Sequence, residues 1–159
     1  MNYDRIEKTI LLRAPRERVW RALSDSREFG AWFGVKLDAP FSPGALVRGK
    51  IVGTIADPAI ATAQKQFEGM PFEIAVDRIE PQSLISFRWH PHAVDPNIDY
   101  SREPTTLIEF ALQDAPDGTI LTVTESGFDR IPLARRAKAF TANEQGWGAV
   151  LQLVEKYLA

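Results

Sequence analysis

Two glutamates near the end of the chain and one histidine in its middle are the side chains best suited to chemistry. Glu125 continues the alternation of Leu121 and Val123, so it should share their inward face of a strand. Glu144 lies on the apolar stripe of a long helical segment. A buried carboxylate needs a partner or a raised pKa. The candidate catalytic residues are therefore Glu125, Glu144 and His90, as general acids or bases or as polar anchors of a ligand.

The alternative is an internal ion pair that only orients the helix. Arg48, Arg78 and Arg88 lie on predicted strands, and one that turns inward would supply the positive charge. No basic residue stands three or four positions from Glu144, so its partner must come from the sheet, a water or a ligand. We expect Glu144 to be held by an arginine at the border of a pocket.

A metal centre is the weaker interpretation of the histidines. His90 and His92, with Asp95 and Asp99, have the right ligand types for zinc or iron. The two histidines flank a proline, and the chain contains no others, so no metal or cofactor is expected. The basic cluster at 135–138 should be a solvated helix edge, with a phosphate or protein contact as the alternative.

Composition narrows the class of protein further. The chain has 159 residues, 19 basic and 21 acidic, and a net charge of −2, so it has no nucleic-acid-binding character. It has no cysteine, no apolar run near the ~18 residues of a transmembrane helix, and no signal-peptide core. We expect a cytoplasmic protein without membrane insertion, folded as a single domain over residues 1–159.

One long helix is predicted at the end of the chain, over residues 133–158. Its stripe at alternating steps of four and three is Leu133, Ala137, Phe140, Glu144, Trp147, Leu151, Val154 and Leu158. At 1.5 Å per residue the helix would be roughly 39 Å long, enough to cover a whole sheet.

Seven strand-like runs precede that helix, separated by proline, glycine and aspartate. They are residues 6–12, 35–37, 45–55, 72–79, 84–90, 106–112 and 119–125. Two short helices follow the first strand, at 16–23 and from the Ser24-Asp25-Ser26 cap to Phe33. Residues 58–67 could form a helical lid or a loose loop, and 91–103 should be an irregular loop. The fold class is α+β, with a curved antiparallel sheet of about seven strands around the C-terminal helix.

Several short motifs, in this order, resemble one known family. They are Ala14-Pro15 through Val19-Trp20 to Leu23, Trp32-Phe33-Gly34, Glu80-Pro81 followed by Ile85, Phe87 and Trp89, Gly118-Thr119, Glu125-Ser126-Gly127-Phe128, and Asn143-Glu144-Gln145-Gly146-Trp147. Together they are similar to the homologues of the activator of the 90-kDa heat-shock-protein ATPase, within the START-like (SRPBCC) superfamily. The resemblance implies the helix-grip fold, also called Bet v 1-like, with an interior cavity for an apolar ligand.

The resemblance leaves several functions open. We favour binding of a small hydrophobic or amphipathic molecule between the sheet and the C-terminal helix. A cofactor-free cyclase or lyase using pocket carboxylates, a chaperone-associated or stress-response protein, and a homodimer are the alternatives. Residues on the inward faces of the strands, together with residues of the small helices and of the C-terminal helix and its entrance, would line the cavity, unless they simply fill a solid core. They are Trp32, Phe72, Phe87, Trp89, Ile108, Phe110, Leu121, Val123, Phe128, Phe140, Glu144, Trp147 and Leu151.

Overall fold

A seven-stranded antiparallel sheet forms the frame of the protein, in a computed structural model that describes residues 4–95 and 97–159. The strand order is β1-β7-β6-β5-β4-β3-β2. The strands are β1 (Arg5–Leu12), β2 (Val35–Leu37), β3 (Leu46–Ile51), β4 (Pro71–Glu80), β5 (Leu84–Trp89), β6 (Thr106–Ala115) and β7 (Gly118–Ser126). Each strand pairs antiparallel with its neighbour, so the predicted sheet is confirmed.

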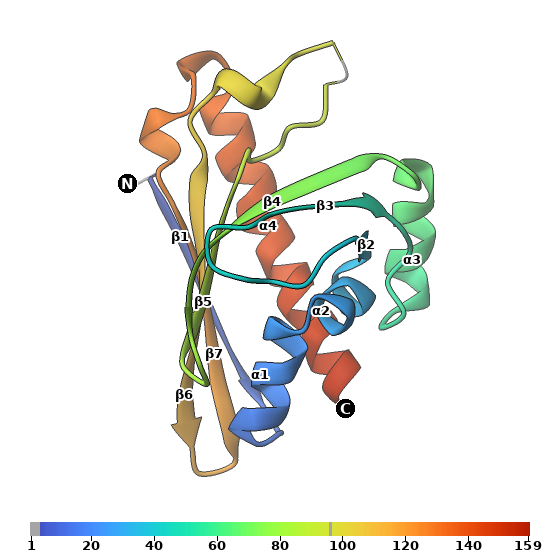
Figure 1. The fold of residues 1–159 in the computed structure, drawn as a ribbon, viewed down its shortest axis with the longest axis vertical. Coiled ribbons are helices and arrows are strands. Elements are labelled where there is room, and N and C mark those ends of the chain that lie inside the picture. Colours follow the sequence, from blue (N-terminus) through green and yellow to red (C-terminus); the bar gives the residue numbers. More distant parts are fainter. Residues whose placement is uncertain (1–3, 96) are drawn as a thin grey trace.

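The C-terminal helix α4 (Leu133–Leu158) has the predicted bounds and runs along the inner side of the curved sheet (Figure 1). The helices α1 (Arg16–Ser24) and α2 (Ser26–Phe33) lie beside its C-terminal half. Asp25 caps α2 by accepting hydrogen bonds from the backbone N–H groups of Arg27 and Glu28. Gly34 ends α2 in a left-handed conformation, with φ 99°. None of the helices in the described part of the chain is long and apolar enough to cross a membrane.

The strand β3 is shorter than predicted, because the chain leaves the sheet after Ile51 and binds to the end of α2 instead. The N–H groups of Val52 and Ile55 donate to carbonyl groups of Gly34 and Ala31, at 2.9 and 3.0 Å. The segment then enters α3 (Pro58–Gln64), which Asp57 caps, and the short 3₁₀ helix η1 (Lys65–Phe67). The predicted helical character of 58–67 is confirmed, and its role as a lid stays a prediction.

The buried face of α4 differs from the predicted stripe in three places. Leu133 is 79% exposed, and Ala137 and Glu144 are also exposed. The prediction that Glu144 faces inward is therefore wrong. At 3.6 residues per turn, the position facing the sheet between Phe140 and Trp147 falls between 143 and 144. The helix is turned so that Asn143 occupies it.

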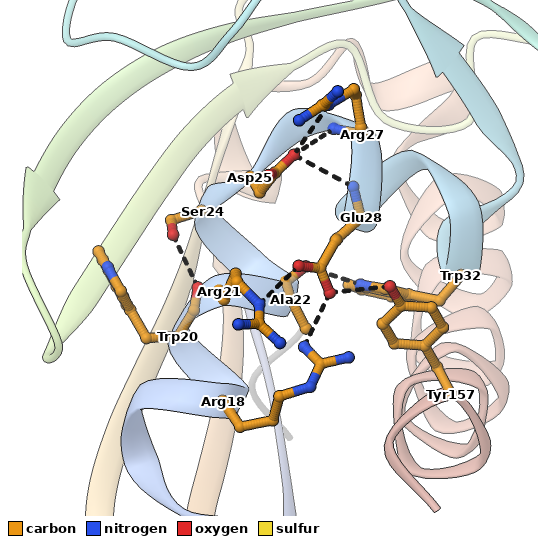
Figure 2. Close-up of polar contacts among 10 residues, drawn as sticks. All are labelled: Arg18, Trp20, Arg21, Ala22, Ser24, Asp25, Arg27, Glu28, Trp32 and Tyr157. Carbon is orange, nitrogen blue, oxygen red and sulfur yellow. Dashed lines mark hydrogen bonds and ion pairs between the residues drawn. The ribbon is translucent and has the colours of Figure 1, made fainter.

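A compact ion-pair cluster joins α4 to the two small helices, as Figure 2 shows. Glu28 accepts hydrogen bonds from Arg18 and Arg21 of α1, at 2.7 and 2.8 Å. The Tyr157 hydroxyl of α4 donates to the same carboxylate at 2.8 Å. Burial raises the pKa of Glu28, but the Tyr157 and Arg18 hydrogen bonds and the two arginine charges outweigh it and hold this pKa below its usual value.

The Glu28→Gln variant should be less stable than the wild type by about 1–2 kcal/mol at pH 7, because the charged hydrogen bonds become neutral ones. The folded pKa of Glu28 is lowered, so its contribution is present above the unfolded pKa and is lost as pH falls through the folded pKa. The gap between the two proteins should therefore close below about pH 4.5. Urea unfolding at pH 7 and 3.5 measures it. Glu17→Gln, at an exposed position of α1, is the matched control, and an equal loss in both variants would contradict the role of the cluster.

Candidate functional site: an apolar cleft beside a buried glutamate

The side chain of Glu125 is fully buried and accepts four hydrogen bonds. Its Oε2 accepts from Trp89 Nε1 at 2.7 Å and from the Thr106 hydroxyl at 2.5 Å. Its Oε1 accepts from Asn143 Nδ2 at 2.9 Å and from Trp147 Nε1 at 2.8 Å. The glutamate on β7 thus joins β5, β6 and α4 at one point.

The strand register explains this convergence. Glu125 of β7 pairs with Ile108 of β6, and Thr106 of β6 pairs with Trp89 of β5. Alternate residues of neighbouring antiparallel strands share one face, so Trp89, Thr106 and Glu125 all point toward α4. The inward position of Glu125 agrees with its predicted alternation.

The expected arginine partner does not lie here. Arg48, Arg78 and Arg88 pair with Glu73, Glu109 and Asp77 on the outer face of the sheet. Within the described ranges, no basic side chain forms an ion pair with Glu125, so neutral donors alone satisfy its carboxylate. A carboxylate offers about four acceptor positions. All of them are used, which leaves no free position at which Glu125 would take a substrate proton.

The hydrogen bonds to Glu125 hold two indole rings in a fixed arrangement. Trp89 and Trp147 stack with their ring centroids 5.7 Å apart and their planes at 27°. Phe72 meets the edge of Trp89 at 6.2 Å, and Phe110 meets Trp147 at 5.8 Å. Because Glu125 binds both indole N–H groups, it positions the rings while their apolar surfaces face outward from it.

An open cleft of about 380 Å³ lies against this aromatic group. One wall comes from the sheet, one from η1 and the residues after it, and one from the loop after β5, and Asn143 of α4 also lines the cleft. Its lining residues are Ile51, Phe67, Met70, Pro71, Phe72, Glu73, Trp89, His90, His92, Ala93, Val94, Tyr100 and Asn143. A smaller cleft of about 70 Å³ shares Trp89 and Asn143 with it and reaches Trp147, Phe33, Gly146 and Val150.

Only some of the apolar residues that were predicted to line a cavity lie at the two clefts. Phe72 and Trp89 line the larger cleft, and Trp147 lines the smaller one. The other predicted apolar positions are at most 6% exposed and belong to the packed core, the alternative that the sequence left open. They are Trp32, Phe87, Ile108, Phe110, Leu121, Val123, Phe128, Phe140 and Leu151.

The third candidate, His90, borders the cleft with its Nε2 3.1 Å from the carbonyl oxygen of Glu103. Among residues 4–95 and 97–159, no three histidines, aspartates or glutamates come together as a metal site. The sequence interpretation missed Asn143, Thr106 and Tyr100. Helical periodicity allowed Asn143 as well as Glu144, so a wider stripe would have included it.

Arg135 fixes the loop that forms the outer wall of the cleft. Its guanidinium donates to Glu103 Oε1 at 2.5 and 2.9 Å and to the carbonyl oxygen of Pro91 at 2.7 Å. It also lies over the Tyr100 ring, 4.8 Å from the centroid. The Arg135 side chain is only 15% exposed, so the expectation of a solvated helix edge is wrong at this residue. The contacts of this one partly buried side chain hold the irregular loop to α4.

A curved antiparallel sheet closed around a long C-terminal helix, with two short helices after the first strand, is the helix-grip fold of START-like proteins. The sequence profile of the family described as "Activator of Hsp90 ATPase homolog 1-like protein" matches residues 13–159. The chain belongs to this family.

Solved structures share the fold at low sequence identity. The protein MLL2253 from Mesorhizobium loti is 22% identical with a TM-score of 0.70, over 97% of this chain and 96% of that one. The Aha1 protein from Colwellia psychrerythraea, solved as a dimer, is 15% identical with a TM-score of 0.66, over 97% and 95%.

DynU16, a protein in the dynemicin biosynthetic locus, is 27% identical with a TM-score of 0.66 over 98% of this chain. The present chain spans about half of its length, 47%. No curated protein matches this sequence. The comparisons therefore define the family and the fold, and the activity has to be argued from the site.

Proposed function

We propose that this protein binds a small hydrophobic or amphipathic molecule in the cleft beside Glu125. The observation that carries the proposal is the arrangement of Trp89 and Phe72. Both side chains remain half-buried at a cleft of about 380 Å³, whereas most other inward-facing aromatic residues are sealed in the core. Ligand sites are typically concave, apolar and within this size range.

The polar groups of the cleft favour a binding site with a few orienting contacts. His90, His92 and Asn143 line it among mainly apolar neighbours, which is the usual composition of a site for small molecules. The fully engaged Glu125 acts as a positioning residue, because it orients Trp89 and Asn143 without facing the ligand. This arrangement supports binding over acid–base catalysis by Glu125.

The Phe72→Ala variant should bind the neutral fluorescent probe N-phenyl-1-naphthylamine about 5- to 20-fold more weakly than the wild type. The substitution removes an aromatic wall from the cleft, and such contacts contribute on the order of 1–2 kcal/mol. Fluorescence titration of the purified protein measures both dissociation constants.

Phe41→Ala is the matched control, because Phe41 is also half-buried but packs at a different place, against Phe29 and Phe87. It should leave binding of the probe within twofold of wild type. Equal binding by the wild type and Phe72→Ala, or no binding at all, would overturn the cleft as the ligand site.

A further inference from the structure

We propose that the natural ligand is an amphipathic anion, whose acidic group binds at His92 and Lys138 while its apolar body covers Trp89. This inference rests on the proposed function and assigns the chemical class of the ligand. The anion is a carboxylate, phosphate or sulfonate, and these share the chemistry that a lysine ammonium and an imidazole N–H recognise.

His92 is an unusual lining residue of the cleft. It is half-buried, and within the described part of the chain neither of its ring nitrogens has a hydrogen-bond partner. Its backbone has a φ of 49°, a left-handed conformation that is uncommon for any residue other than glycine. No buried side-chain nitrogen of the described residues lacks a hydrogen-bond partner, so the unpartnered ring nitrogens of His92 reach the solvent of the cleft. The imidazole is therefore available to a ligand, whereas His90 lies at hydrogen-bond distance from the carbonyl of Glu103.

A hydrogen bond from Arg135 to the neighbouring residue fixes the position of His92 at the cleft. Arg135 binds the carbonyl oxygen of Pro91, the residue immediately before it. Arg135 is itself neutralised by Glu103. Lys138 lies three residues further along α4, on the same side of the helix, and has no ion-pair partner among the residues that the structure describes. Its unpaired positive charge acts on His92.

Two positive charges act on His92. Burial lowers the pKa of His92 first, and the positive charges of Lys138 and Arg135 lower it further. The other titratable groups of the surrounding elements are Glu73 of β4, His90 after β5, Tyr100 of η2 (Tyr100–Arg102), and Asp95, Asp99 and Glu103 of the loop. Of the carboxylates, Glu73 is paired with Arg48 and Glu103 with Arg135. A bound anion would offset the unpaired charge and favour protonation of His92.

Two probes with the same ring system separate the anion from the apolar body. N-Phenyl-1-naphthylamine is neutral, and 8-anilino-1-naphthalenesulfonate adds one sulfonate group to it. The wild type should bind the sulfonate about 5- to 20-fold more tightly, the range expected for partly exposed charged hydrogen bonds. Fluorescence titrations at pH 6.5 measure both affinities.

Two substitutions locate the anion. Lys138→Gln and His92→Asn should each weaken sulfonate binding about 3- to 10-fold while leaving the neutral probe within twofold of wild type. Asparagine tolerates the left-handed backbone, so the His92→Asn variant keeps the loop conformation. Lys36→Gln, which removes an exposed lysine of β2 outside the cleft, is the matched control and should change neither affinity.

The pH dependence gives a second readout. Lowering the pH from 7.5 to 5.5 should strengthen sulfonate binding by the wild type, because protonated His92 binds the anion. Titration calorimetry in two buffers with different ionisation enthalpies should show proton uptake on binding. The His92→Asn variant retains His90, so loss of uptake in that variant assigns the proton to His92.

Each result decides one of the two proposals. Equal affinities for both probes, or sulfonate binding that neither substitution changes, would overturn the anionic ligand while the cleft remains a binding site for apolar molecules. Failure of both probes to bind, or binding that Phe72→Ala does not weaken, would instead overturn the proposed function itself.

Discussion

Replacing Glu125 by glutamine should lower the free energy of unfolding by about 2–4 kcal/mol, whichever way the new amide is turned. If its NH₂ group takes the place of Oε2, the Thr106 hydroxyl can rotate and accept, but the indole N–H of Trp89 cannot. If it takes the place of Oε1, the Asn143 amide can flip, but the indole N–H of Trp147 loses its acceptor. One buried donor is stranded in either case, and the remaining hydrogen bonds lose their charge.

Thermal and urea unfolding measure this loss, which corresponds to a fall in Tm of roughly 5–15 °C for a chain of this length. Glu144→Gln is the matched control, since Glu144 is exposed on α4 and has no ion-pair partner in the described ranges. It should change stability by less than about 0.5 kcal/mol. If the two variants were equally stable, Glu125 would not be the centre of the polar group.

The long helix and the sheet were predictable because local signals and long-range packing agree there. Residues 133–158 contain no proline, have helical periodicity and follow Pro132, and the structure places α4 at those same bounds. Pro116 and Asp117 connect β6 to β7, between the paired residues Ala115 and Gly118. The strand β3 ended early for a tertiary reason, since Val52 and Ile55 bind α2 instead of continuing the sheet.

The choice between Glu125 and Glu144 shows where periodicity loses precision. A strand has a period of two, so Leu121 and Val123 determine the direction of Glu125 without ambiguity. A helix has 3.6 residues per turn, so neighbouring positions differ by only about 100° in direction. Both 143 and 144 therefore fit the stripe that Phe140 and Trp147 define. The indole and amide donors around Glu125 decide the rotation, because they require Asn143 to face inward.

The cleft was the least predictable part of the site. Its outer wall is an irregular loop whose position depends on Arg135, a residue from a distant element. The sequence showed 135–138 only as a charged cluster, and nothing local indicated that one member, Arg135, would pack over the ring of Tyr100. Loop walls are set by such single tertiary contacts, which leave no periodic signal in the sequence.

Replacing Trp147 by alanine should cost about 3–5 kcal/mol, the range for removing a large buried aromatic side chain. The indole is 3% exposed, stacks on Trp89 and meets the edge of Phe110. It also supplies one of the four hydrogen bonds to Glu125. The loss should therefore combine an unfilled cavity in the core with a weaker polar network.

The Trp147→Phe variant separates these two parts. It keeps most of the apolar volume but loses the indole N–H, so it should cost only about 1–2 kcal/mol. Trp20→Ala is the control, because Trp20 is only half-buried and makes no contact with Glu125. Urea unfolding of all three variants should rank Trp147→Ala as the least stable. A loss below about 1 kcal/mol in Trp147→Ala would place the indole outside the core and contradict the packing of α4 against the sheet.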